Sequence, residues 1–266
     1  MLPLVRKGEP GPTPGADILR DRVILVSGAT GGFGRSCALA CARVGATLIL
    51  LGRRVRALES LYDEIEALGA PIPAIYPMDL EGATPQDYAD LAGAVQRDCR
   101  RLDGIVHAAA HFKELQPFDQ QPPEEWERSQ RVNVTAPLLL TQACMPLLRD
   151  VPDAAIVFVL DDLERVGRSF WGAYGVAKHA LVGLVSIIHE ETESSPVRTH
   201  ALLPAPMRTT IRRKAYFGED TLRHPLPDIA GAAAAWLLGP QAAELRGKIL
   251  ALGPEAGTAG STIWPD

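Results

Sequence analysis

Short apolar runs rich in β-branched residues alternate along the chain with longer segments whose apolar residues recur at helical spacing. The apolar runs are residues 22–27, 46–51, 71–76, 102–108, 154–160, 197–203 and 248–252. The segments with helical spacing are residues 33–44, 54–68, 84–99, 123–148, 172–193 and 228–238. Strands that are apolar on both faces and alternate with helices form parallel sheets covered on each side. The pattern therefore predicts an α/β fold, a doubly wound, seven-stranded parallel sheet with helices on both faces.

The same pattern divides the chain into one domain and two flanking segments. No linker interrupts residues 21–253, so we expect a single domain there, including a substrate lid at about residues 205–225. Residues 1–20 are rich in proline and glycine, and we expect them to form an N-terminal arm outside the core. The arm has no long apolar stretch, which argues against a signal peptide. Residues 254–266 are expected to form a C-terminal tail.

Composition narrows the classes of function. With 47% hydrophobic and 22% charged residues the chain is typical of a folded globular protein rather than a disordered one. The net charge of −5 and the lack of a basic run argue against nucleic acid or a membrane surface as partner, and no apolar run could span a bilayer. The cysteines form no C-x-x-C pair and no ligand cluster, so we expect reduced thiols, no metal and a cytoplasmic protein.

The first strand leads directly into a glycine-rich turn, SGATGGFG, and then into a helix. Gly28, Gly32 and Gly34 permit a tight turn, a close approach of the backbone to a ligand, and close helix packing. The free N–H groups and the positive end of the helix dipole then face an anion. In this strand–turn–helix order the glycines predict a phosphate-binding site.

The turn G-A-x-x-G-x-G, followed much later by Y-x-x-x-K, resembles the short-chain dehydrogenase/reductase family. The resemblance covers roughly residues 21–253, and the phrases ILLGR, RLDG and WGAY are similar to the YciK-like bacterial branch. It implies a Rossmann fold and an NAD(P)-dependent oxidoreductase that interconverts a carbonyl and an alcohol of a small molecule. It also implies a homodimer or homotetramer that pairs the helices at 123–148 and 172–193.

The second strand ends without the carboxylate that would bind the adenosine ribose of NAD. Arg53 and Arg54 follow instead and can bind a 2′-phosphate through charge-assisted hydrogen bonds, so we expect NADP to be preferred over NAD. The alternative is a pair of solvated arginines, which the helix dipole disfavours. Asp79 matches the family residue near the adenine, or else caps the next helix. The resemblance assigns the cofactor to Gly28, Thr30, Gly32, Phe33, Gly34, Arg53, Arg54, Asp79, Leu80, Ala109, Tyr174, Lys178, Pro204 and Thr209.

Tyr174 and Lys178 lie four residues apart and share a helix face. A nearby ammonium lowers the pKa of a tyrosine from its ordinary value of about 10 toward neutrality. The resemblance implies that Tyr174 is the general acid and base, that Lys178 also binds the nicotinamide ribose, and that Asn133 holds a proton-relay water. The alternative for Tyr174 and Lys178 is a chance pair on an amphipathic helix. The alternative for Asn133 is a polar residue tolerated in the middle of a helix.

The chain departs from the family pattern at several positions of the site. The fourth strand ends in HAAAH, which puts Ala108 and Ala110 where the family has Asn and Gly, and Ala205 follows Pro204. His107 and His111 invite a metal interpretation, but a strand-to-loop change breaks the spacing that ligation needs. Arg208, Arg212, Arg213 and Lys214 of the lid either receive an acidic substrate or form a solvated helix face.

Asp161 stands 13 residues before Tyr174, where the family has a catalytic hydroxyl, and Asp162 is the alternative if the loop is shifted by one residue. An ionised carboxylate there would raise the pKa of Tyr174 and repel an alkoxide, unless Asp161 is protonated or turned away. Two functions therefore remain open: a weakened reductase that works best below neutral pH, with Asp161 in its catalytic set, and an NADP(H)-binding sensor or scaffold without catalysis.

Overall fold

The computed structural model describes residues 2–7 and 11–253, so the expected C-terminal tail at 254–266 lies outside the described residues. The strands are β1 (Leu4–Lys7), β2 (Val23–Ser27), β3 (Thr47–Gly52), β4 (Ala74–Pro77), β5 (Gly104–His107), β6 (Ala154–Val159), β7 (Val197–Leu203) and β8 (Ile249–Leu252). The α-helices are α1 (Gly32–Arg43), α2 (Val55–Ala67), α3 (Pro85–Asp98), α4 (Pro123–Gln130), α5 (Ala136–Arg149), α6 (Leu163–Val166), α7 (Gly172–Thr192), α8 (Thr210–Ala215) and α9 (Asp228–Leu238).

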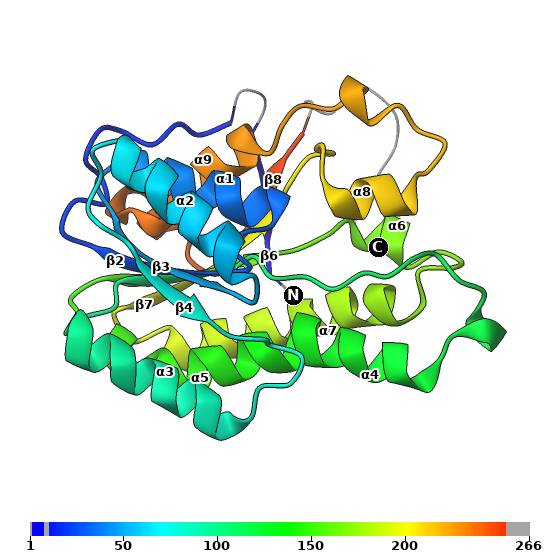
Figure 1. Ribbon diagram of the computed structural model, residues 1–266, viewed down its shortest axis with the longest axis horizontal. Coiled ribbons are helices and arrows are strands. Elements are labelled where there is room, and N and C mark those ends of the chain that lie inside the picture. Colours follow the sequence, from blue (N-terminus) through cyan, green and yellow to red (C-terminus); the bar gives the residue numbers. More distant parts are fainter. Residues whose placement is uncertain (1, 8–10, 254–266) are drawn as a thin grey trace.

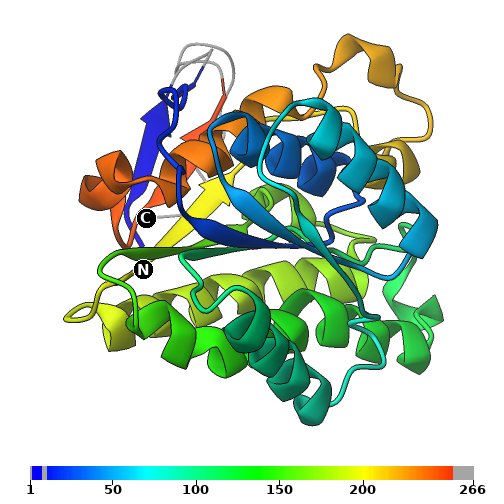
Figure 2. The ribbon, with the colours of Figure 1, turned by 60° about the vertical axis from the view of Figure 1, so that its left-hand side comes forward.

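All strands join one parallel sheet in the order β1-β8-β7-β6-β5-β2-β3-β4. Helices α1, α2 and α9 cover one face, and α3, α5 and α7 cover the other (Figures 1 and 2). Two apolar cores fill the layers between sheet and helices, because the strands are apolar on both sides. The prediction of a doubly wound parallel sheet with helices on both faces is confirmed.

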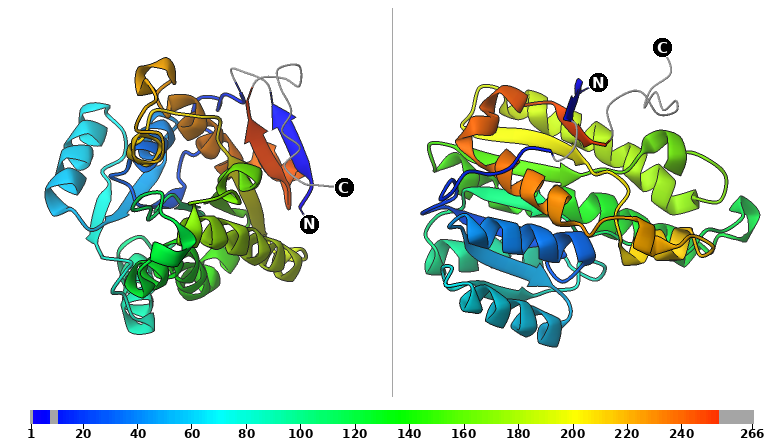
Figure 3. Two further views of the ribbon diagram at one scale, coloured as in Figure 1. Left: turned by 90° about the vertical axis from the view of Figure 1, so that its right-hand side faces the viewer. Right: turned by 90° about the horizontal axis from the view of Figure 1, so that it is seen from above.

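The predicted number of strands was wrong, since the described residues form eight strands rather than seven. The additional strand is β1, which lies in the segment expected to be an arm and pairs in parallel with β8, Leu4 opposite Ile249. Figure 3 shows β1 and β8 side by side at the edge of the sheet. The short run LVRK follows a proline and carries little apolar pattern, so its partner across the sheet, rather than its own sequence, makes it a strand.

The predicted helix at 123–148 is interrupted. The chain forms α4, then a π-helical turn at Arg131–Thr135, then α5. Such turns are rare and often occur at functional sites. The strand predicted at 71–76 begins only at Ala74, because Pro71 and Pro73 lack the N–H groups that a ladder requires.

The chain leaves β2 in one direction across the sheet toward β4 and returns at β5 to continue in the other direction. In such sheets a crevice forms beyond the carboxyl ends of the strands where the order reverses. The glycine turn after β2 and the HAAAH segment after β5 both reach this crevice. Helices α6 and α8 lie together beyond the same end of the sheet (Figure 1).

Candidate active site

The glycine turn is shaped by two backbone approaches. Gly28 has φ +66°, and a Cβ there would lie 2.6 Å from the Cα of Ala109, while a Cβ on Gly34 would lie 2.2 Å from the carbonyl oxygen of Gly28. A Cβ on Gly32 would make only an ordinary contact, 3.5 Å from the methyl of Thr209. Helix α1 begins at Gly32, and Gly31 before it supplies no capping side chain, so the first N–H groups remain for an anion.

Two arginines stand beside this turn at the start of α2. The Nη2 of Arg54 donates to the carbonyl oxygen of Thr30 at 3.0 Å and to its Oγ1 at 3.3 Å. The Nη1 of Arg53 lies 4.0 Å from Asp79 Oδ1, and the side chain is 62% exposed. The guanidinium groups therefore border the turn with most of their donors open to solvent or to an anionic ligand.

A continuous cavity of about 450 Å³ runs from the glycine turn to the N-terminal part of α7. It is lined by nearly all the residues that the sequence assigned to the site: Gly28, Thr30, Gly32, Phe33, Gly34, Arg53, Arg54, Asp79, Leu80, Ala109, Asp161, Tyr174, Lys178, Pro204 and Thr209. Asn133 lies behind the wall instead. The sequence analysis missed Phe112, Arg165, Trp171 and Tyr216, which also line the cavity near Tyr174.

Asp161 takes the position predicted for a catalytic hydroxyl. The Tyr174 hydroxyl donates to its Oδ2 at 2.8 Å, and Arg165 pairs with its Oδ1. The neighbouring Asp162 instead caps α6, accepting a bond from the backbone N–H of Arg165 at 3.3 Å. Of the alternatives considered for Asp161, a side chain that turns away is therefore not the one that the structure adopts.

Burial dominates the ionisation of the Tyr–Lys pair. It raises the pKa of Tyr174 well above 10, the charge of Asp161 raises it further, and the charge of Arg165 lowers it. Burial also lowers the pKa of Lys178, which Asp161 partly offsets. The Lys178 ammonium donates to the carbonyl oxygen of Val159 at 3.0 Å and lies 5.6 Å from the centroid of the Tyr174 ring. Burial and the Asp161 charge thus favour the protonated form of the phenol.

Asn133 lies in the π-helical turn, and the protein satisfies its side chain. Its Oδ1 accepts from the backbone N–H of His111 at 3.0 Å, and its Nδ2 donates to the His111 carbonyl at 2.9 Å and to Ser129 Oγ at 3.0 Å. Both amide hydrogens are therefore used. These bonds fix the loop after β5, which forms one wall of the cavity.

The two histidines of the HAAAH segment have separate environments. His107 is buried, stacks on Phe158 with ring centroids 4.5 Å apart, and bonds Thr141 Oγ1 at 2.9 Å. Burial lowers its pKa to about 3. His111 pairs with the buried carboxylate of Glu125. Over residues 2–7 and 11–253 no three potential ligands gather around a possible metal position.

The lid is braced by its own charges. Arg212 makes two hydrogen bonds to Glu219, at 2.7 and 2.6 Å, and His224 bonds the same carboxylate at 2.9 Å. Arg208 donates to the carbonyl oxygens of Leu222 and His224. Arg208 and Arg212 thus hold the lid together, which neither alternative considered for them anticipated.

Aromatic side chains form the wall beside the Tyr174 phenol. Phe112 lies 5.2 Å from the Tyr174 ring and 5.3 Å from Trp171, and Trp171 lies 6.2 Å from Tyr216, measured between ring centroids. Lys214 joins this wall to the lid, because its ammonium donates to the carbonyl oxygen of Phe112 at 3.3 Å. The space in front of Tyr174 is therefore largely apolar on the side away from Asp161.

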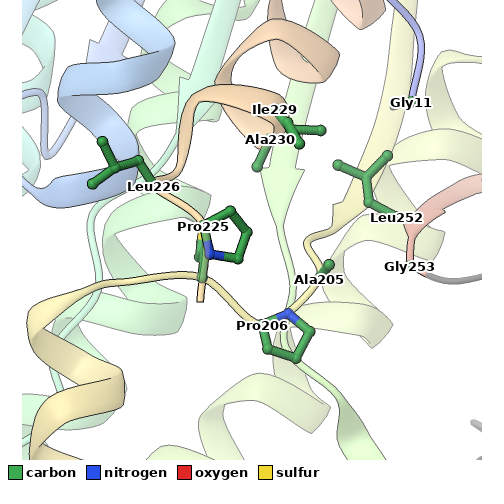
Figure 4. Close-up of a pocket in the computed structure, with 10 residues that line it drawn as sticks. Gly11, Ala205, Pro206, Pro225, Leu226, Ile229, Ala230, Leu252 and Gly253 are labelled. Carbon is green, nitrogen blue, oxygen red and sulfur yellow. The ribbon is translucent and has the colours of Figure 1, made fainter. Parts of the chain in front are cut away.

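A second, smaller cavity lies under the base of the lid (Figure 4). It measures about 20 Å³ and is lined mainly by apolar groups, including Ala205, Leu226, Ile229 and Leu252. A space of this size holds about one water. It cannot accept a substrate, so the large cavity is the candidate active site.

Comparison with known proteins agrees with the fold. Residues 22–219 match the family model described as short chain dehydrogenase, and the chain belongs to this family. Its relatives place it in the branch that includes YciK of Escherichia coli K12, described as an uncharacterized oxidoreductase. The two are 34% identical over 226 residues, 85% of this chain and 89% of the relative.

Solved structures show the same architecture. A short chain dehydrogenase from Pseudomonas syringae has 38% identity and a TM-score of 0.86 over 90% of this chain and 97% of its own. One from Escherichia coli CFT073, complexed with NADPH, has 34% identity and a TM-score of 0.85 over 90% of this chain and 99% of its own.

Among the helices that the structure describes, none combines the length and the apolar composition that a membrane-spanning helix requires.

Proposed function

We propose that the protein is an NADP-dependent oxidoreductase that interconverts a carbonyl and an alcohol, with Tyr174 as general acid and base. The observation that carries the proposal is the single cavity that contains the glycine turn, both arginines, Tyr174 and Lys178. A cofactor that reaches from the glycine turn to Tyr174 and Lys178 would contact residues along this lining.

The residues present fit NADP better than NAD. The end of β3 offers Leu51 and Gly52 but no carboxylate for a ribose hydroxyl, whereas Arg53 and Arg54 can neutralise a 2′-phosphate. The open N–H groups at the start of α1 suit the pyrophosphate, and Lys178 suits the nicotinamide ribose. The relative from Escherichia coli CFT073 that is complexed with NADPH supports this choice. When bound, NADPH supplies the hydride.

The chain's own residues supply the proton. In the reducing direction, the Tyr174 hydroxyl donates its proton to the carbonyl oxygen as that oxygen gains negative charge. The raised pKa of Tyr174 keeps the phenol protonated, as reduction requires, but it also makes the phenol a weaker acid, which agrees with the slow turnover expected below. The aromatic wall of Phe112, Trp171 and Tyr216 favours ketones with an apolar substituent.

One observation favours the second function, an NADP(H)-binding sensor or scaffold without catalysis. The Tyr174 hydroxyl already donates its proton to Asp161 Oδ2, at 2.8 Å. An enzyme in which this bond persists would bind NADP(H) without turnover, as a sensor or scaffold.

NADPH oxidation with a panel of ketones and diones, from about pH 5 to 9, separates the two functions. We expect slow turnover that is faster at the acid end, abolished by Tyr174→Phe and increased by Asp161→Ser. Tight NADPH binding with no turnover in any variant would favour the sensor. A slower Asp161→Ser enzyme at every pH would assign Asp161 a catalytic role of its own.

Cofactor choice is tested by binding. We expect NADPH to bind more tightly than NADH, and the double variant Arg53→Ala/Arg54→Ala to remove the difference. Equal dissociation constants in the wild type would contradict the preference.

We also propose a homodimer or homotetramer in the cytoplasm. On α7, Val176 is 47% exposed and Ile187 is 56% exposed, and a partner helix would cover both. Free thiols at Cys37, Cys41, Cys99 and Cys144 suit a reducing compartment. A monomer in light scattering at micromolar concentration would contradict the assembly.

A further inference from the structure

The Asp161 carboxylate joins two side chains, one at each oxygen. Its Oδ2 accepts the Tyr174 hydroxyl at 2.8 Å, and its Oδ1 pairs with the Nη2 of Arg165. Arg165 lines the same cavity as Tyr174 and Lys178. The position that should carry a small neutral hydroxyl is therefore filled by an ion pair.

We propose that Arg165 is a positioning residue for the reaction: it fixes the Asp161 carboxylate and offsets its charge, so that an acid can stand beside Tyr174 without stopping catalysis. This inference rests on the proposed reductase function. A carboxylate alone next to the phenol would disfavour the negative charge that develops on the substrate oxygen. A carboxylate paired with a guanidinium acts on that oxygen as a dipole, and its effect falls off much faster with distance.

The contacts of Arg165 point to this role more than to a structural one. The short helix α6 is anchored by the buried Leu163 and Val166 and is capped by Asp162, so it does not depend on the Arg165 side chain. The Nε–H of Arg165 is buried and donates to none of the residues that the structure describes. Asp161 is thus the principal anchor of the guanidinium.

Other ionisable groups near Asp161 and Arg165 also affect the local charge. They are Tyr174 and Lys178 of α7, Asp162 at the start of α6, and Tyr216 after α8. The charge of Arg165 lowers the pKa of Tyr174, in opposition to burial and to Asp161. Loss of Arg165 therefore acts on Tyr174 twice, by removing a cation and by leaving a carboxylate without its partner.

The test is a double-mutant cycle that combines Arg165→Gln with Asp161→Ser. Without the charge of Arg165, the Tyr174 hydroxyl becomes a weaker acid. We expect Arg165→Gln to lower kcat about tenfold near neutral pH, because a change of one unit in the pKa of Tyr174 corresponds to a factor of ten. The loss should shrink as the pH falls, since protonation neutralises the lone carboxylate. In the Asp161→Ser background, Arg165→Gln should change kcat less than about twofold, because no carboxylate remains to offset.

Two further variants control for folding and for surface charge. Arg165→Lys keeps the charge but not the forked geometry, and its kcat should lie between those of the wild type and Arg165→Gln, which preserves the test if Arg165→Gln does not fold. Arg168→Gln removes a nearby arginine that is 71% exposed and bonds Glu164. Its pH profile should match that of the wild type.

A readout without turnover separates this inference from the proposed function. In protein labelled with ¹³C-aspartate, the Asp161 carboxyl signal, assigned with Asp161→Asn, should move in Arg165→Gln and stay in place in Arg168→Gln. If the wild type reduces no substrate, the reductase proposal fails while this signal still tests the pair. An unchanged signal in Arg165→Gln, or an equal loss of kcat in both backgrounds, would overturn the role of Arg165.

Discussion

Gly32 and Gly34 stand two residues apart in the glycine turn, but only one is required by the fold. An alanine Cβ at position 34 would collide with the carbonyl oxygen of Gly28 at 2.2 Å, whereas at position 32 it would lie 3.5 Å from Thr209. We expect Gly34→Ala to lower the free energy of unfolding by about 1–3 kcal/mol, as overpacking does.

Gly32→Ala is the matched control for Gly34→Ala. We expect it to leave the free energy of unfolding within about 0.5 kcal/mol of the wild type and to weaken NADPH binding, because Gly32 lines the cavity proposed for the cofactor. Urea denaturation and fluorescence titration measure the two effects. Equal stability of the two variants would show that the turn can relax around Gly34.

At the scale of residues, the gathering of side chains in the cavity was predictable where spacing along helices and strands determines it. Tyr174, Lys178 and Asp161 meet in the cavity because a helix and a strand of predictable length carry them there. Arg165 could not be predicted, since its pairing with Asp161 depends on how a loop and a four-residue helix turn above the sheet. The bonds of Asn133 to His111 likewise depend on a π-helical turn that no periodicity indicates.

At the scale of elements, the lid is held by the Glu219 carboxylate, which lies between Arg212 and His224. Arg212 first and then His224 hold the pKa of Glu219 at about 2, so its charge persists across the working pH range. We expect Glu219→Gln to loosen the segment that follows α8, raising KM for the carbonyl substrate several-fold with a smaller change in kcat.

Limited proteolysis measures this loosening directly, and cleavage between residues 205 and 225 should become faster in Glu219→Gln. The matched control is Glu244→Gln in the Pro240–Leu245 turn, where the glutamate is exposed. If Glu219→Gln and Glu244→Gln behave alike in KM and in proteolysis, the ion pair does not hold the lid.

The order of elements was largely predictable and their exact ends were not. Buried parallel strands are apolar throughout, so β2, β3, β6 and β7 stand out from the sequence. Strand β1 has only four residues at a sheet edge, and nothing in its own sequence encodes the partner. Edge strands depend on a neighbour formed elsewhere in the chain, which a local pattern does not contain.

At the scale of the whole molecule, two buried histidines make the fold sensitive to acid. Burial lowers the pKa of His107 and of His200 from 6.5 to about 3. In this pH range the two histidines bind protons in the unfolded chain but stay neutral in the folded protein. The free energy of unfolding therefore falls as the pH drops from 6.5 toward 3. As the pH falls from 7 to 5, we expect each histidine to lower the free energy of unfolding by about 2 kcal/mol.

His107→Gln tests this linkage, because glutamine can still hydrogen-bond Thr141 but does not titrate. Its free energy of unfolding, from urea denaturation at both pH values, should fall by about 2 kcal/mol less than that of the wild type. A parallel decline in the two proteins would mean that His107 does not remain neutral in the folded state.

The edge strand β1 makes a separate contribution to stability. Removal of residues 1–7 would uncover β8 and take away Leu2, which is 4% exposed and packs in the apolar core. We expect Tm to fall by about 5 °C and self-association to increase, because an open edge pairs with other chains. Leu2→Ala alone should lower Tm without the self-association, and an unchanged oligomer distribution in the truncated protein would exclude a protective role for β1.

The pairing of β1 with β8 also sets an order of events during biosynthesis. A chain emerges from the ribosome N-terminus first, at roughly 5–20 residues per second, so β1 is made before every other described strand and its partner β8 after them. Strands β2 to β7 can assemble while β1 still lacks a neighbour. This edge of the sheet closes only after β8 has been made, and a nascent chain that stops before Ile249 leaves β1 without its partner.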